Sequence, residues 1–144
     1  MLHKLLLYIH ILSAIASIGP FFVFIPIVRK LRTAEDAGLR AYLDSFRVAI
    51  RLAKHAGHVL VLSGVGLIYA GFWSWETSWI VITLAILVSS LLFLARAFSP
   101  TIRAFDKPES DKAQLVHKLN RSVWIYLILL MIMLAFMVVK PTVW

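Results

Sequence analysis

The chain has 144 residues, of which 61% are hydrophobic, and a formal net charge of +8. This length allows one compact domain and excludes a separate soluble domain, while the lack of cysteine excludes disulfides, thiolate metal sites and cysteine nucleophiles. In a soluble protein this charge would suggest nucleic acid as a partner, but here the basic residues flank long apolar runs, which argues against nucleic-acid binding.

Four long runs along the chain contain no Asp, Glu, Lys or Arg. Each run is close to the ~20 residues that a helix needs to cross a hydrocarbon core of ~30 Å. We therefore predict an all-α fold, an integral membrane four-helix bundle that forms a single transmembrane domain over residues 1–144. The predicted spans cover about 5–28, 54–74, 77–98 and 121–140.

An amphipathic stretch separates the first two spans. Leu39, Leu43, Phe46 and Ile50 recur at helical spacing, with charged residues between them. This pattern predicts a cytoplasmic interfacial amphipathic helix before the second span, running into that span.

The second span carries Gly57, Gly64 and Gly71 at intervals of seven residues. Small residues on one face let helix backbones approach closely in lipid, so we interpret this face as a packing surface. The approach of a ligand at Gly64 and Gly66 is the alternative.

The third span has few distinctive features. We expect Pro100 to end the helix that continues beyond this span. A new helix is predicted from about Asp111, and the fourth span should stop at Lys140 and Pro141.

All fifteen Lys and Arg except Lys4 and Lys140 fall in two segments, 29–54 and 96–121. Because basic residues collect on the cytoplasmic side of a membrane, we predict that the loops 29–53 and 99–120 are cytoplasmic and that both termini lie outside. A functional interpretation of the same positive charge is attraction of the loops to anionic lipid headgroups.

Histidine is the only residue type inside the uncharged runs that ordinarily titrates near neutral pH, at His10, His55 and His58, and His117 precedes the fourth span. Ionisable residues are costly inside a membrane and indicate function by default. A neutral imidazole can ligate a metal or haem iron, relay a proton, or hydrogen-bond across helices. His10 shares a polar helix face with Ser13, so it should point into the bundle.

The depths of these histidines restrict their pairing. At 1.5 Å per residue, His10 lies about 9 Å inward from Lys4, and His58 about 6 Å inward from Lys54 on the opposite side. In a core of ~30 Å the two rings are then about 15 Å apart in depth, too far for one iron between straight helices. His58 and His117 are closer in level. Three arrangements stay open: two sites at different depths, one haem with mixed ligands, and a shift of the first span at a kink.

Met131, Met133 and Met137 on the fourth span raise copper as an alternative, since thioethers suit Cu(I). Met131 and Met133 point about 200° apart on a helix, so only Met133 and Met137 share a face. We interpret these methionines as packing residues.

Two end segments, 6–13 (LLYIHILS) and 137–141 (MVVKP), together with Gly19 and Pro26, resemble an uncharacterised family of small four-span bacterial integral membrane proteins. That family is similar to HemJ-type protoporphyrinogen oxidases and to the CopD copper-resistance membrane domain. The resemblance implies a multi-pass protein of the bacterial cytoplasmic (inner) membrane with a haem-linked role, in which His10 matches the first-helix histidine. Segment 79–84 lacks the histidine and lysine of the HemJ third helix, which favours haem binding or an accessory role over oxidation of protoporphyrinogen.

We therefore predict a haem- or porphyrin-binding membrane protein with a role in electron transfer or haem metabolism. Its cofactor would be haem b, and whether it is an enzyme is left open. The candidate cofactor ligands are His10, His58, His55 and His117, with His10 and His58 first as metal ligands. One alternative is a structural or assembly subunit that packs against a membrane partner or a second copy, and another is a small copper or solute transporter. All three share the lipid bilayer as a partner.

Overall fold

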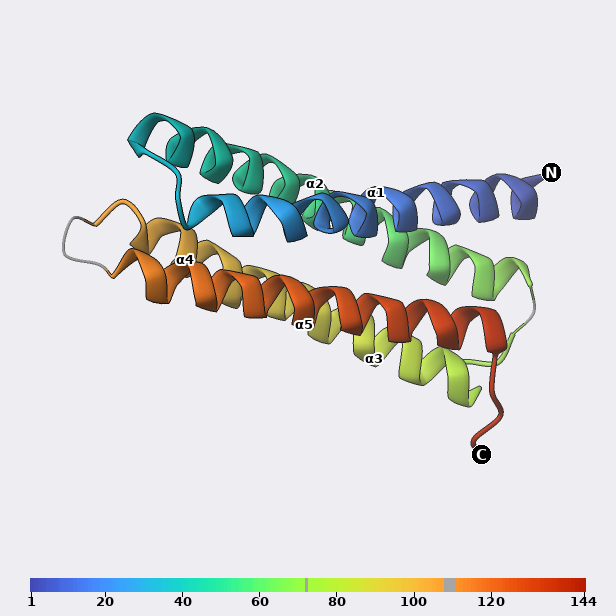
Figure 1. Ribbon diagram of the computed structural model, residues 1–144. Helices are drawn as coiled ribbons and strands as arrows, with labels where there is room; N and C mark the ends of the chain where they lie inside the picture. The colour runs from blue at the N-terminus through green and yellow to red at the C-terminus, as the bar shows by residue number, and fades with distance from the viewer. Residues whose placement is uncertain (72, 108–110) are drawn as a thin grey trace.

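The computed structural model describes residues 1–71, 73–107 and 111–144. Four long helical segments lie side by side in the described part of the chain (Figure 1). All four are long and apolar enough to cross a membrane, which confirms the prediction of an all-α membrane four-helix bundle. The elements are α1 (Leu2–Leu31), α2 (Asp36–Ala70), α3 (Ser78–Phe93), the π-helical η1 (Leu94–Phe98), α4 (Ser99–Ala104) and α5 (Lys112–Val139).

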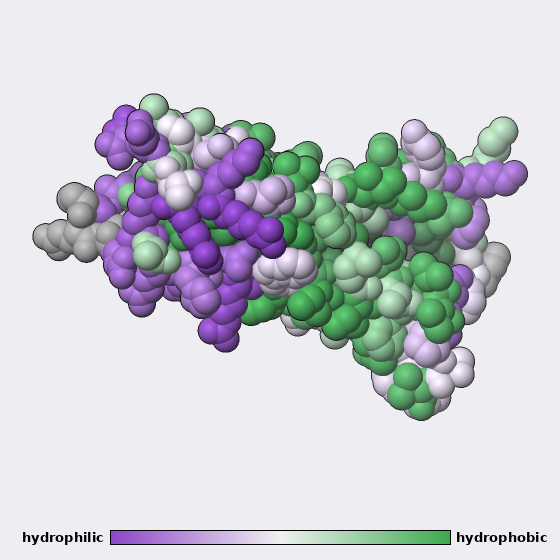
Figure 2. All heavy atoms as spheres, in the orientation of Figure 1, coloured by the Kyte–Doolittle hydropathy of each residue, from purple (hydrophilic) through white to green (hydrophobic). Residues whose placement is uncertain are grey.

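The two ends of the bundle differ in character. The α1–α2 turn and the segment between α4 and α5 lie at one end, here called the basic end, and both termini lie at the other, here called the terminal end (Figure 1). Figure 2 shows hydrophilic side chains gathered over the basic end and apolar side chains over most of the remaining surface.

The basic residues of different helices begin at a similar level. At 1.5 Å per residue, Lys54 lies about 24 Å from the end of α2, and Arg96 and Arg121 lie about 27 Å from the terminal ends of α3 and α5. The stretch without basic residues is thus close to the ~30 Å of a hydrocarbon core. The bundle is longer than this stretch, so its basic end projects beyond it.

The amphipathic stretch between the first two spans is helical and runs into the second span as predicted, as the first half of α2. Leu43 and Phe46 are buried there in one cluster with Val28 and Leu31 of α1. The apolar face therefore packs on α1, where we predicted contact with the membrane interface. Because the first half of α2 covers α1 there, the apolar run of α1 continues into the basic end.

A cluster of aromatic rings fills the bundle between its middle and the basic end. Phe24 stacks on Phe46 with ring centroids 3.9 Å apart, and Phe21 lies 4.4 Å from Tyr126. Phe98 meets Phe21 edge-on at 5.5 Å. All five rings are buried, so this half of the molecule, here called the packed half, has a continuous core.

Two helix ends agree with the sequence and one does not. Asp111 caps α5, since its carboxylate accepts a hydrogen bond from the Ala113 amide at 3.1 Å, and α5 ends at Lys140 as predicted. Pro100 does not end the helix, which runs on to Ala104, and the π-helical turn η1 lies just before the proline.

Candidate ligand-binding cavity

A cavity of about 850 Å³ lies between the four spans, in the half of the bundle next to the terminal end. We call this half the cavity half. Cofactor and ligand sites typically enclose about 300–1,000 Å³ and are mostly apolar with a few polar groups. The walls here have that composition. The polar or partly polar side chains that line the cavity are His3, His10, Thr83, Lys140, Trp73 and Trp79.

The cavity also reaches the side of the bundle between α1 and α5. Ile15 and Phe22 of α1 and Met131 and Val138 of α5 line it, yet all four side chains are exposed. The two helices diverge toward the terminal end (Figure 1). Since this surface lies within the apolar part of the bundle, a hydrophobic molecule can enter from the bilayer.

His10 is held against α2 by its Nδ1 atom. Nδ1 lies 3.1 Å from the Leu60 carbonyl oxygen and 3.0 Å from the Ser63 hydroxyl oxygen. A carbonyl oxygen only accepts hydrogen bonds, so Nδ1 carries the proton and donates it. The Ser63 hydroxyl donates to the same carbonyl, which leaves its oxygen free to accept from His10. Nε2 of the neutral ring therefore keeps its lone pair, and no described residue bonds to that atom.

Gly64 gives the imidazole its space. A Cβ atom at this position would lie 3.2 Å from Cε1 of His10, so the ring sits directly on the α2 backbone. Gly57 makes a similar space for Leu91 of α3, and Gly71 for Trp73. The glycine face is thus used for packing inside the bundle, and Gly64 also serves the residue that lines the cavity.

Thr83 of α3 is the one buried side chain, among the residues described, whose polar atom lacks a hydrogen bond. It lines the cavity and is 5% exposed. Helical Thr residues commonly bond a carbonyl one turn back, as Thr101 does to Ala97 at 2.7 Å. The other buried Ser and Thr residues all have partners: Ser13, Ser17, Ser63, Ser78, Ser90, Thr101 and Ser122. The Thr83 hydroxyl therefore has no partner in the described part of the chain, but its oxygen is fully buried, so a ligand would reach it only after the side chain rotates.

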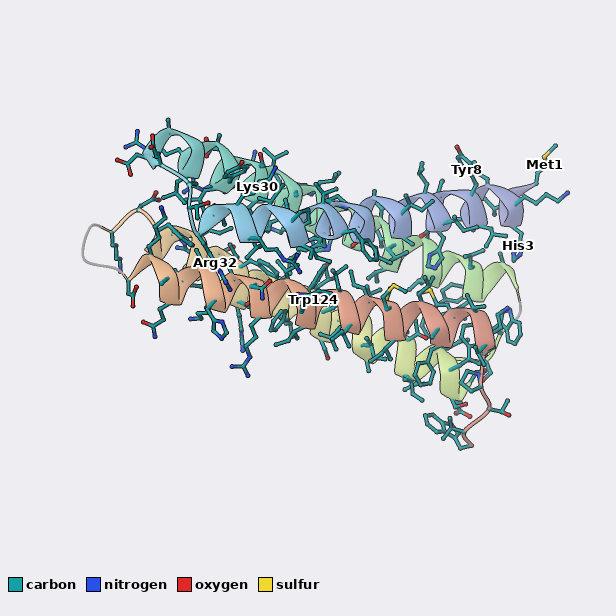
Figure 3. The ribbon with its side chains drawn as sticks, viewed as in Figure 1. Met1, His3, Tyr8, Lys30, Arg32 and Trp124 are labelled. Carbon is teal, nitrogen blue, oxygen red and sulfur yellow. The ribbon has the colours of Figure 1, made fainter. Side chains whose placement is uncertain are left out.

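Lys140 and His3 lie at the terminal end of the cavity. The Lys140 ammonium is 5.3 Å from the ring centroid of Trp73 and 5.4 Å from that of Trp79. His3 points from α1 toward the other helices, whereas Tyr8 points away from the bundle (Figure 3). The polar groups of the wall are thus concentrated at this mouth.

The structure separates His10 from the other predicted ligands. His55, His58 and His117 are all exposed, and none of them lines the cavity. No group of three or more His, Cys, Asp or Glu side chains that could hold a metal ion forms among the described residues. Any ligand bound in this cavity would therefore meet His10 without help from these three residues.

The predicted difference in depth between His10 and His58 is wrong. His10 lies about 31 Å before the end of α1 and His58 about 33 Å after the start of α2, and these two helix ends are joined by a short turn. The two residues are therefore nearly level. They stay apart because His58 is exposed, whereas Leu60, Ser63 and Gly64 meet His10 from the other side of α2.

The methionines pack as interpreted from the sequence. Met133 is fully buried in the core and Met137 packs against the same core cluster. Met131 and Met137 also line the cavity, whereas Met133 does not.

Sequence reasoning missed Thr83 and Lys140 as lining residues. Thr83 had a signal, because it is one of few polar residues in an otherwise plain span. Lys140 was noted only as part of an end segment, and its approach to the two Trp rings depends on how α5 ends.

Comparisons of the chain with protein-family models, curated proteins and solved structures give no match. The resemblance of the two end segments to the HemJ- and CopD-related family stays a prediction.

Proposed function

We propose that this protein binds a haem or a related porphyrin in the cavity, with Nε2 of His10 as the iron ligand. The observation that supports this proposal is the state of the His10 ring. Its Nδ1–H donates to the Leu60 carbonyl, and its Nε2 lone pair is unused beside a large apolar cavity. Metal-binding histidines typically have this arrangement, in which a backbone carbonyl fixes the tautomer and the orientation of the ring.

The other lining residues suit the same group. The apolar walls would exclude water and contact the macrocycle, and the Thr83 hydroxyl could bond a polar atom inside the cavity. A bound haem would supply one-electron chemistry, so electron transfer or haem metabolism is the role we propose.

One histidine of this chain is expected to hold the iron. His3 also lines the cavity, about 10 Å along α1 from His10, but it is exposed at the terminal end, so we propose His10 alone as the ligand. The exposed His55, His58 and His117 are outside the cavity.

We place the protein in the bacterial inner membrane with the basic end in the cytoplasm, because translocation of basic residues is disfavoured. The cavity would then open toward the outer leaflet and the periplasmic surface. Any redox partner that reaches its mouth would do so from that side.

The test is the optical spectrum of the purified protein, as prepared and after addition of haemin, in the oxidised and the dithionite-reduced state. We expect a Soret band for wild type and for His58→Ala, whose side chain is exposed, and loss or a large shift of the band for His10→Gly. Added imidazole should restore the His10→Gly spectrum, because it can occupy the space that the ring leaves.

A wild-type protein that stays colourless after haemin addition would contradict the proposal. Copper in stoichiometric amounts in the same sample would instead favour the copper alternative.

A further inference from the structure

We infer that the cavity accepts an amphipathic carboxylate, and that the Lys140 ammonium at the mouth recognises its carboxylate group. This inference rests on the proposed function, because it names the class of molecule that enters the cavity beside His10. For a porphyrin, the acid groups would be its carboxylates.

The charge of Lys140 is held in place without being neutralised. Its Nζ atom lies within cation–π distance of Trp73 and Trp79. Ring faces attract the ammonium but supply no anionic oxygen. Within the described ranges of the chain, no carboxylate forms an ion pair with Lys140, and the ion pairs found there belong to Arg47 at the basic end. The ammonium can therefore still donate to an acid.

The backbone at Lys140 gives a second, independent observation. Its φ is 51°, the only positive value among described residues other than glycine. The left-handed conformation at a helix end is usually taken by glycine, which has no Cβ to strain it. The turn alone would favour glycine, so the presence of lysine indicates that its side chain has a use.

The segment after Lys140 is tied to the start of α3. The Ser78 hydroxyl donates to the Pro141 carbonyl at 3.2 Å and accepts from the Val143 amide at 2.9 Å. The Trp144 indole nitrogen donates to the Glu76 carbonyl at 3.0 Å. These bonds fix the segment after Lys140 to the chain between Trp73 and Trp79, so the ammonium is positioned before any ligand arrives.

The distribution of polarity gives the ligand its orientation. The deep walls are apolar apart from His10 and Thr83, and the positive charge lies at the mouth. A molecule with an apolar body and an acid group at one end matches this gradient. A neutral isoprenoid or an entirely apolar molecule would leave Lys140 unused.

The experiment compares haemin with haemin dimethyl ester, in which both carboxylates are blocked. Dissociation constants would be measured by Soret titration in phosphatidylcholine nanodiscs for wild type, Lys140→Gly, Lys140→Arg and Lys4→Ala. Glycine suits the backbone at position 140, so this variant should fold, and Lys4→Ala removes a cation from the same end but outside the cavity lining.

We expect wild type to bind haemin about tenfold more tightly than the ester, since a hydrogen bond to a charged group contributes that much. Lys140→Gly should lose this preference, while Lys140→Arg and Lys4→Ala should keep it. Equal affinities of wild type for the two probes, or an equal loss in Lys4→Ala, would overturn the inference and leave the haem proposal intact.

If wild type binds neither haemin nor its ester, the proposed function is wrong. The role of Lys140 is then tested with a second pair of molecules. A fluorescent fatty acid and its methyl ester would then be titrated into the same proteins, and a lack of preference for the acid would overturn the role of Lys140. Co-purification of anionic phospholipid that depends on Lys140, without any preference for either acid probe, would assign Lys140 to lipid phosphate and also overturn it.

Discussion

The packed half and the cavity half of this bundle are built from the same four spans but differ in what fills the space between them. In the packed half, five aromatic rings from α1, α2, η1 and α5 meet in one buried cluster. In the cavity half, the same spans enclose about 850 Å³ and place a histidine and an unbonded threonine hydroxyl on its wall. A rigid core at one end thus supports a binding site at the other.

The difference follows from the lengths and the ends of the helices. The amphipathic first half of α2 covers α1 at the basic end, and η1 brings Phe98 into the cluster. At the terminal end α1 and α5 diverge (Figure 1), and many side chains of α1 there are exposed. Preorganised sites commonly depend on such a well-packed region for their geometry.

The largest expected effect tests the packed half. Phe21 is fully buried, and its neighbour Phe22 is 51% exposed on the cavity side. We expect Phe21→Ala to lower the free energy of unfolding by about 3 kcal/mol, because it leaves a void in the ring cluster. Phe22→Ala should cost less than about 0.5 kcal/mol. Unfolding in mixed detergent micelles would measure both, and equal losses would contradict the division into two halves.

The second prediction tests the cavity half through Gly64. In Gly64→Ala the new methyl group would lie 3.2 Å from the His10 ring, which its hydrogen bonds hold in place. We expect the affinity for haemin to fall about tenfold, or about 1.4 kcal/mol.

Gly38→Ala is the matched control, because its new methyl group meets only an ordinary contact, 3.9 Å from Ala34. It should leave haemin affinity unchanged and raise stability by about 0.5–1 kcal/mol through helix propensity. Unchanged haemin affinity in Gly64→Ala would mean that the position of the ring does not matter for binding.

The third prediction compares one residue type in the two halves. Thr101→Val removes a hydrogen bond to Ala97 and should lower the free energy of unfolding by about 1 kcal/mol. Thr83→Val removes a hydroxyl that has no partner, so stability should stay the same or rise, while haemin affinity falls. Thermal unfolding with and without haemin would measure both. A loss of stability in haem-free Thr83→Val would show that Thr83 has a structural role.

The smallest effect is expected at the surface of the basic end. Arg47 bridges Asp44 at 2.8 Å and Asp106 at 3.1 Å, and these side chains are exposed. Solvent screens such pairs, so Arg47→Ala should cost about 0.5 kcal/mol, and less in high salt. Haemin affinity should not change. A measurable change would show that the two halves are coupled.

Much of the site depended on the rotation of α2, which its apolar run does not determine. The polar stripe of α1 predicted that His10 faces inward, and this prediction is confirmed by its contacts with α2. His58, as a candidate ligand, was also expected to face inward, but it is exposed. Its neighbour Gly57 accepts Leu91 from α3, and this packing turns His58 to the outer surface. Small residues on α2 therefore marked the inner face better than the histidines did.

The sequence by itself determined the number of spans, the membrane class and the difference between the two ends, because each follows from runs of uncharged residues and from the positions of Lys and Arg. Only the tertiary structure decided which histidine has a free ring nitrogen at a cavity, which hydroxyl lacks a partner, and where the last lysine lies. These features depend on how helices distant in sequence rotate and diverge, and that is set by the packing of side chains from different spans.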